Sequence, residues 1–560
     1  MTLTMSSFSA FPRRRLRLWA SALCGVLCWL LGAGPLRADS SPPAATAADG
    51  FSTALAQLTD SDFDVKGHAI KALLASQDKR TLGVLQALLD GRLYYRRSNR
   101  QIVMAKEAGD DTYALTEALS STAVGTVPKH DIKKIGIDNA LRTELNGAIA
   151  RLSLGSPDPA VRHAAVKSMY NTLTPENIER LRTLAATDPD ATVQRAIHTA
   201  LALADVGSPD KAVRLRAIAA LGGKLEPEAR NGLRALTQSG TGTDQEVRAA
   251  ANKALASIDA KLQFYQLVQT VFFGLSLGSV LLLSAIGLAI TFGVMGVINM
   301  AHGELMMLGA YTTYLIQRAL PGQLELSLFM AIPAAFLMAG LFGVAIERGV
   351  IRFLYGRPLE TLLATFGISL ILQQLVRTTI SAQNVTVSTP AWMSGSLALN
   401  DALSLTYNRM YILLFALLVF AGLQLILKKT SLGLRVRAVA QNRPMARAMG
   451  IRTGWVDALT FGLGSGIAGI AGVALSQLTN VGPNMGQSYI IDSFMVVVFG
   501  GVGNLWGTLV GALSLGVANK FLEPYSGAVL AKILVLVFII LFIQKRPRGL
   551  FPQKGRGAEA

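Results

Sequence analysis

Two long stretches without a charged side chain, both in the second half of the sequence, set the strongest limit on its fold. Residues 267–301 contain no Asp, Glu, Lys or Arg, and residues 458–491 contain none either. A soluble domain cannot bury so much apolar surface, whereas a bilayer core accepts about 20 apolar residues per helix. The C-terminal half is therefore expected to be a polytopic α-helical membrane domain, whose function depends on a pathway through the membrane.

The N-terminus has the three parts of a secretory signal peptide. A basic segment is followed by an apolar core over residues 18–31 and by the small residue Ala38 where cleavage is expected. We expect residues 1–38 to be a signal peptide, with an uncleaved first span as the alternative. The only cysteines, Cys24 and Cys28, lie inside this segment, so no disulfide framework is expected in the mature chain.

Residues 39–260 are polar and carry an irregular repeat. Each repeat has a polar turn, then Val and a basic or polar residue, then small apolar residues at helical spacing. The Val-containing triplets begin at Asp64, Ala160, Thr192, Ala212 and Glu246. Helices with narrow Ala/Leu stripes bury them by stacking on neighbours, as in an α-solenoid. The repeats resemble degenerate HEAT repeats in an exported helical domain, and ordinary amphipathic helices are the alternative.

Residues 91–135 break this helical pattern. Two short stretches, residues 93–95 and 101–104, flank the polar pair Ser98 and Asn99. This arrangement predicts a β-hairpin within a chain whose fold class is otherwise expected to be all-α.

Nine apolar segments are expected to span the membrane. They are residues 267–290, 301–318, 326–346, 361–380, 410–427, 456–477, 489–502, 505–521 and 529–544. As an alternative to full crossings, broken or re-entrant elements are possible at segment 291–300 and at the pair 489–502 and 505–521. The membrane domain is expected over residues 261–552, followed by a tail over residues 553–560.

Basic residues cluster in alternate loops of this domain. Loop 428–454 holds seven basic residues and no acidic one, and loop 347–360 and the segment after residue 544 are also basic, whereas loop 478–488 has no basic residue. Lys and Arg concentrate on the cytoplasmic side of a membrane. An exported N-terminal region followed by nine crossings places all three basic segments in the cytoplasm of a bacterial inner-membrane protein. The net charge of +18 is thus attributed to topology, and no nucleic-acid partner is expected because no basic-aromatic module is visible.

A first polar motif interrupts the apolar region at residues 296–311. Asn299, His302 and Glu304 cannot all share one helix face, and Gly303 lies among them. Burying an ionisable side chain in a membrane costs free energy, so such residues are candidates for a translocation pathway. The backbone groups freed by a local helix break would line a cavity. The alternative is a turn that caps two helices at the cytoplasmic surface. One His and one Glu are too few ligands for a metal site.

A second motif lies in the basic loop at residues 434–451. Pro444 suits the first turn of a short helix, with Asn442 at its cap and Gly450 at its end. Such a helix, with Ala446 and Met449 on one side, suits docking into a partner's groove. The alternative is a loop that only fixes topology and touches anionic lipid. The candidate docking residues are Arg435, Arg437, Asn442, Arg443, Ala446, Arg447, Met449 and Gly450.

A third motif contains Gly500, Gly501, Gly503 and Asn504. It predicts a bent backbone near the pathway, and close helix packing is the alternative. A match to GxGxxG at residues 464–469 lies inside an uncharged span and does not follow a strand, so the dinucleotide-binding interpretation fails. No GxxxxGK[ST] motif is present. We therefore expect neither a cofactor nor ATP hydrolysis by this chain.

Together these motifs resemble the permease family of branched-chain amino acid ABC importers. The matching stretches are INMAHGELMMLGAY, RAVAQNRPMARAMGI, VFGGVGNLWGTLVGA and the terminal RPRGLF, within residues 265–552. The resemblance implies that residues 435–451 contact an ATPase subunit. The exported extension resembles the urea-importer branch of the family.

The resemblance implies a transport subunit rather than an enzyme, with urea as its expected solute. The expected partners are a second homologous permease, two cytoplasmic ATP-binding subunits, a periplasmic solute-binding protein and membrane lipid. A permease for branched-chain amino acids or short amides is the alternative. A passive channel would not explain a basic loop that carries the start and stop signals of a short helix. A receptor built on the solenoid would not explain the glycine-rich spans.

Overall fold

The computed structural model describes residues 46–551 except 77, 110–111, 121 and 239–243. The expected signal peptide with its two cysteines and the expected tail 553–560 lie outside the described residues. The chain forms two compact units, one of residues up to 180 together with 186–196, the other of residues 181–185 together with 197 onwards.

The first unit combines helices with a sheet. The helices α1 (Thr46–Gln57), α2 (Phe63–Ala75), α3 (Thr81–Leu89) and α4 (Asn139–Ser153) share an apolar core that includes Phe51, Leu85 and Leu145. An antiparallel sheet in the order β4-β3-β2-β1-β5 is inserted between α3 and α4. Its strands are β1 (Leu93–Arg96), β2 (Ile102–Gly109), β3 (Thr112–Glu117), β4 (Ala123–Pro128) and β5 (Ile132–Lys134).

The predicted hairpin is confirmed as β1 and β2, in which Leu93 lies opposite Met104. The expected all-α class omitted the rest of this five-stranded sheet. Its outer strands are hard to recognise because they are short and weakly apolar. Strand β4, for example, is mostly exposed, so it lacks the apolar alternation that identifies a half-buried strand.

Each predicted repeat coincides with a helix. These helices are α2, α5 (Pro159–Ser168), α7 (Ala191–Asp205), α8 (Lys211–Leu221) and α10 (Gln245–Met295), while α6 (Pro175–Thr187) and α9 (Pro227–Gln238) lie between them. An Asp side chain accepts a backbone N–H at the start of each of the five, namely Asp62, Asp158, Asp190, Asp210 and Asp244. The polar turn of the repeat is therefore a helix N-cap. Stacking of these helices into a solenoid stays a prediction.

All nine predicted spans coincide with helical segments of the second unit. They lie in α10, α11 (His302–Ala319), α12 (Leu324–Gly349), α13 (Pro358–Thr379), α14 (Tyr407–Lys429), α17 (Thr453–Ser476), α18 (Met485–Gly500) and α19 (Leu505–Lys545). Six helices of the described part are long and apolar enough to cross a membrane, and α18 is a shorter apolar helix. The protein is thus a multi-pass membrane protein.

Helix α19 consists of two halves that run in opposite directions. The backbone leaves the helical conformation at Gly527 (φ 77°, ψ 162°). The two ends of this helical hairpin meet, because Asn504 Nδ2 donates to Phe551 O at 3.2 Å. Helix α18 packs against the second half, since the rings of Phe499 and Phe542 lie 4.9 Å apart. The two halves correspond to the predicted spans 505–521 and 529–544.

Helix α17 is the central helix of the bundle and packs against α10, α11 and α12. Its glycines allow backbones to approach closely, because a Cβ at Gly464 would lie 2.7 Å from Gly287 O on α10. A Cβ at Gly472 would collide with Met306 O and lie 2.7 Å from Ala310 N on α11. The expectation that the GxGxxG match at 464–469 serves helix packing is therefore confirmed.

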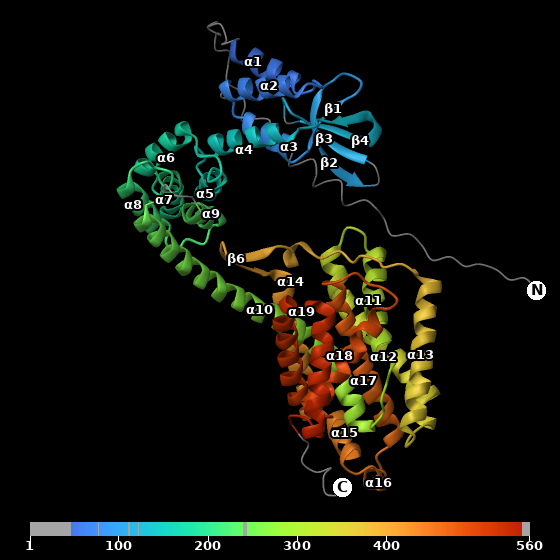
Figure 1. Ribbon diagram of the computed structural model, residues 1–560. Helices are drawn as coiled ribbons and strands as arrows, with labels where there is room; N and C mark the ends of the chain where they lie inside the picture. The colour runs from blue at the N-terminus through green and yellow to red at the C-terminus, as the bar shows by residue number, and fades with distance from the viewer. Residues whose placement is uncertain (1–45, 77, 110–111, 121, 239–243, 552–560) are drawn as a thin grey trace, which may run out of the picture. The chain divides into compact units, whose positions relative to one another are not determined.

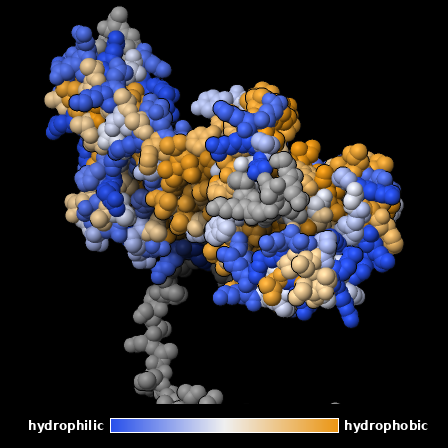
Figure 2. Space-filling view, turned by 90° about the horizontal axis from the view of Figure 1, so that it is seen from below, coloured by the Kyte–Doolittle hydropathy of each residue, from blue (hydrophilic) through white to orange (hydrophobic). Residues whose placement is uncertain are grey.

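The two ends of the membrane bundle carry different elements. The short helices α15 (Ser431–Gln441) and α16 (Arg443–Ala448) lie at one end, and the hairpin of β6 (Ser396–Asn400) and β7 (Leu403–Thr406) lies at the other (Figure 1). Figure 2 views the molecule from the α16 end and shows hydrophilic residues gathered there beside broad apolar areas. Large apolar side chains remain exposed along the bundle, such as Leu363 on α13 (71% exposed), which suits contact with lipid or another membrane protein.

Candidate functional site

The segment between α10 and α11 returns into the interior of the bundle. Helix α10 ends at Met295, where Gly296 takes a left-handed conformation (φ 68°). His302 Nε2 then lies 2.9 Å from the carbonyl oxygen of Ser284, which precedes Met295 by eleven residues. Eleven residues of helix correspond to about 16 Å. The non-helical residues 296–301 therefore run back alongside α10, so the re-entrant alternative for 291–300 holds for the second half of that segment, whereas residues 291–295 continue α10.

The polar side chains of this segment are buried. Asn299, His302 and Glu304 are at most 1% exposed, so they do not form a solvated cap at the membrane surface. Glu304 Oε1 accepts hydrogen bonds from Gln373 Nε2 at 2.8 Å and from Ser369 Oγ at 3.1 Å. His302 Nε2 donates to Ser284 O, which leaves Nδ1 as an acceptor.

Three buried polar atoms of this cluster have no hydrogen-bond partner among the described residues. They are Asn299 Nδ2, His302 Nδ1 and Glu304 Oε2. Buried polar groups are normally satisfied by protein, water or a ligand. The cluster therefore contains three buried polar atoms that an ordered water or a polar ligand would satisfy.

Helix α13 completes this cluster with three side chains that the sequence analysis did not single out. Thr365, Ser369 and Gln373 are spaced four residues apart, so they lie on one helix face. Thr365 Oγ1 accepts the backbone N–H of Met300 at 3.1 Å, and the other two bind Glu304. A polar row at this spacing in an apolar span is the pattern that could have identified them.

The glycine-rich motif lies at a different depth. A Cβ at Gly293, near the end of α10, would lie 2.5 Å from Gly503 Cα, whereas His302 contacts α10 at Ser284. Asn504 caps α19, since its Oδ1 accepts from Trp506 N at 3.0 Å and Gly507 N at 3.1 Å. The structure therefore does not place Asn504 in the Glu304 cluster.

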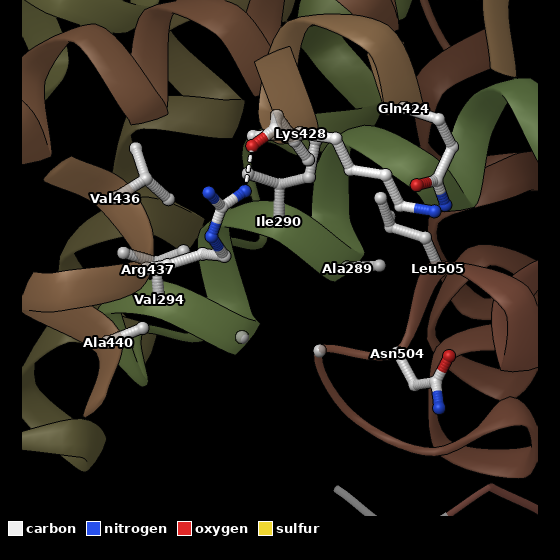
Figure 3. A pocket seen from close by; sticks show the side chains of 13 residues that line it. Ala289, Ile290, Val294, Gln424, Lys428, Val436, Arg437, Ala440, Asn504 and Leu505 are labelled. Atoms are coloured by element: carbon white, nitrogen blue, oxygen red, sulfur yellow. Dashed lines mark hydrogen bonds between the residues drawn. The ribbon is translucent and has the colours of Figure 1, made fainter. Parts of the chain in front are cut away.

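Gly501 and Gly503 have positive φ values of 105° and 79°, and Gly500 packs closely on Gly507. This geometry favours the packing alternative for the glycines and gives Asn504 a structural role. A cavity of about 580 Å³ nevertheless adjoins the turn, lined by Gly503, Asn504 and parts of α10, α14 and α15 (Figure 3).

The basic loop forms the helices α15 and α16 with the expected caps. Asn442 Oδ1 accepts Met445 N at 3.0 Å, Pro444 lies in the first turn, and Gly450 follows the helix with φ 83°. The expected direction of Ala446 is wrong. It is only 5% exposed and packs with Val436, Val439 and Val456, because the inner face of α16 lies on α15 and α17.

The exposed apolar side chains of this helix are instead Met445 (60%) and Met449 (76%). They are four residues apart and so lie on one face. Of the remaining candidates, Arg435, Arg437 and Arg447 are exposed on the same two-helix element. Arg437 donates to Leu427 O, and Arg447 Nη2 donates to Thr453 Oγ1 at 3.4 Å.

A buried ionic network connects α16 to the membrane helices. Arg443 donates to Asp457 of α17, whose side chain is 0% exposed. The Arg443 guanidinium also lies over the ring of Tyr355, 4.7 Å from its centroid. Tyr355 in turn donates to Glu347 Oε1 of α12 at 2.9 Å. Burial, and then the Asp457 and Glu347 carboxylates, raise the pKa of Tyr355, so the phenol keeps its proton as a donor.

Comparisons with known proteins cover the membrane region. The profile of the family described as "Branched-chain amino acid transport system / permease component" matches residues 270–543. The branched-chain amino acid permease protein LivH of Salmonella typhimurium strain LT2 is 31% identical over 297 residues, which are 51% of this chain and 96% of that protein. The permease protein BraD of Pseudomonas aeruginosa is 30% identical over 298 residues, with coverages of 51% and 96%.

A more distant relative is the ribose import permease protein RbsC of Haemophilus influenzae, 25% identical over 235 residues that are 39% of this chain and 69% of that protein. No solved structure matches the chain. These relatives are permeases and not enzymes. The extent of the LivH and BraD matches shows that this chain belongs to the family of branched-chain amino acid transport system permease components.

Proposed function

We propose that the chain is a permease subunit of an ABC importer and carries part of the solute pathway past the Glu304 cluster. The observation that carries this proposal is the re-entrant segment, which brings three unpartnered polar atoms into the bundle. Irregular backbone at membrane depth is tolerated where protein or a cavity surrounds it. Transporters use such broken elements to bind polar solutes near the midplane.

In this proposal α15 and α16 couple ATP hydrolysis by the partner subunits to transport through the membrane domain. The exposed pair Met445 and Met449 would enter a groove on a cytoplasmic ATP-binding subunit, as apolar helix faces do in other complexes. The implied importer contains two such subunits, a second homologous permease and a periplasmic solute-binding protein. Exposed apolar faces such as that of α13 would meet this second permease or lipid.

A branched-chain amino acid is the favoured solute, because LivH and BraD are named for that transport. Urea, the solute expected from the sequence, finds no support in these relatives. One observation keeps urea as the second candidate. The family match begins at residue 270, so the helical and sheet region before it is outside the part matched by that profile.

The proposed orientation places the region before α10 in the periplasm and the α16 end in the cytoplasm. Its support is the positive charge of loop 428–454, together with the position of β6 and β7 at the end of the bundle opposite α16. A reporter fused after Ala260 should be active as a periplasmic protein, and one fused at Gln441 as a cytoplasmic protein. Both reporters on one side would contradict the nine-crossing arrangement.

The deciding experiment measures uptake of labelled leucine and labelled urea in a bacterial strain lacking this chain and in the same strain with the chain restored. Restoration of leucine uptake alone supports the favoured solute, and restoration of urea uptake alone supports the second candidate. Uptake that persists when the cell's ATP is depleted would instead indicate a passive channel. Restoration of neither uptake would contradict both solutes.

A further inference from the structure

We propose that the cavity of about 580 Å³ beside α15 binds the phosphate headgroup of an anionic phospholipid. The cavity is formed where α10 and α14 end, beside the first helix of the basic loop. The proposal goes beyond solute transport and depends on the membrane placement of these helices, not on the identity of the solute.

The charges of the lining residues select an anion. Two cations, Lys428 and Arg437, and two amides, Gln424 and Asn504, line the cavity, and no Asp or Glu is among its lining residues. Neither cation forms an ion pair with a carboxylate in the described part of the chain. Lys428 follows Gln424 by four residues, so both side chains extend from one face of α14. Figure 3 shows them on one side of the opening and Asn504 on the other.

The walls of the cavity select a lipid over a free anion. Apolar residues of the membrane helices form them, namely Ala289, Ile290, Val294, Leu427 and Leu505. Trp506, next to the lining residue Leu505, is 54% exposed and packs edge-on against Phe420, one turn before Gln424 on α14, so an exposed apolar surface adjoins the opening. Basic pockets between helices at the cytoplasmic membrane surface recognise anionic headgroups in this way.

An amino acid solute does not fit the same cavity. Its carboxylate could meet Lys428 or Arg437, but its ammonium group would find no acidic side chain among the lining residues. An unpaired charge in a partly apolar site is unfavourable. The proposed occupant therefore has net negative charge and an apolar part.

The test uses the full-length permease, purified and mixed with equal amounts of phosphatidylglycerol and phosphatidylcholine. Native mass spectrometry counts the retained lipids. The variant Lys428→Gln/Arg437→Gln should lower retained phosphatidylglycerol by about tenfold, because both cations line the cavity and would contact the headgroup phosphate directly. The matched control Lys429→Gln/Arg435→Gln removes two neighbouring charges that do not line the cavity and should change retention much less, because salt screens their attraction to a headgroup they do not contact.

Two further arms keep the result decisive if the double variant folds poorly. Lys428→Arg/Arg437→Lys keeps both charges and should retain the lipid, whereas Ala440→Phe keeps the cations but fills the cavity and should lose it. Equal losses in the cavity variant and the matched control would show diffuse surface attraction and overturn the proposal. So would equal retention of the two lipids, or displacement of phosphatidylglycerol by millimolar inorganic phosphate alone.

Discussion

Arg443 of α16 donates a hydrogen bond to the buried carboxylate of Asp457 on α17, so a surface helix is tied to the central helix of the membrane bundle. Helix α17 also packs backbone to backbone on α11 through Gly472, and α11 carries Glu304. A contiguous chain of contacts thus joins the proposed coupling helix to the polar cluster. Such a connection is a structural relationship, and energetic coupling along it needs a direct test.

Arg443→Ala should uncouple the importer and destabilise the junction. The change leaves the Asp457 carboxylate buried without its cation, which costs about 3–5 kcal/mol in comparable pairs. Substrate-stimulated ATPase activity of the reconstituted importer should fall strongly, and the permease should melt at a lower temperature. Arg452→Ala, which removes a nearby exposed charge, is the control. Equal behaviour of the two variants would show that the buried pair has no special role.

The Arg443→Ala/Asp457→Ala double variant separates the two effects. Removal of both partners removes the unpaired buried charge, so the melting temperature should recover towards the original value. ATPase stimulation should stay low if the connection itself transmits the signal. Recovery of both properties together would indicate that the pair only stabilises the fold.

Met449→Glu and Met445→Glu should abolish substrate-stimulated ATPase activity while the permease still inserts. Both side chains are exposed and apolar, so a charge there would disturb a docked partner without disturbing the bundle. An anchor residue of an interface typically contributes about 2 kcal/mol or more. Ser431→Glu, a change at an exposed position at the start of α15 and outside the face formed by the two methionines, is the matched control. Co-purification of the ATP-binding subunits should fall in the Met variants only.

Ala446→Glu should behave differently, because Ala446 packs inside the element with Val439 and Val456. A glutamate there adds volume and charge to a buried site. Lower membrane abundance or a lower melting temperature should therefore accompany the loss of coupling. Normal stability with a selective loss of ATPase stimulation would indicate that Ala446 faces the partner after all.

The sequence predicted much of the local structure and less of the tertiary arrangement. The nine spans, the caps at Asn442 and Gly450 and the hairpin near Ser98 depend on neighbouring residues, which determine local conformation. The direction of Ala446 depends on which face of a short helix meets α15 and α17. The partners of Glu304 depend on α13, since Ser369 and Gln373 lie 65 and 69 residues away along the chain.

The buried acids Glu347 and Asp457 show the same limit. Each lies at the end of an apolar span and close to basic residues in the sequence, which is also typical of ordinary charges at the membrane surface. Their partners Tyr355 and Arg443 come from other segments of the chain, so the pairing depends on the tertiary fold. Loop charge predicts the side of the membrane, but it does not predict which charges become buried pairs.

Glu304→Ala should reduce uptake by roughly tenfold or more if this carboxylate binds the passing solute. The substitution also leaves Gln373 Nε2 with its longer bond to Ser369 Oγ alone, at 3.4 Å, so Glu304→Gln, which keeps the size of the side chain, is measured beside it. Glu325→Ala changes an exposed acid at the start of α12 and should have little effect. Uptake is compared at equal membrane abundance, and normal uptake in both Glu304 variants would remove this residue from the pathway.

Gly472→Leu should prevent α11 from packing on α17. A Cβ at Gly472 already collides with the carbonyl oxygen of Met306 and lies 2.7 Å from Ala310 N, and both are backbone atoms that cannot rotate away. Overpacking of this kind costs about 1–3 kcal/mol or more. We expect a lower melting temperature of the purified permease and greater exchange of amide hydrogens along α11.

The control for this change is Gly422→Leu on α14, where a Cβ would meet nothing within 4 Å. It tests whether a large side chain in any membrane helix has the same effect. Gly472→Ala adds only the Cβ and should already destabilise the bundle, whereas Gly422→Ala should be neutral or slightly stabilising because alanine favours a helix. Equal melting temperatures for Gly472→Ala and Gly422→Ala would mean that α11 and α17 are not in direct backbone contact. The path from Arg443 to Glu304 would then lack its middle step.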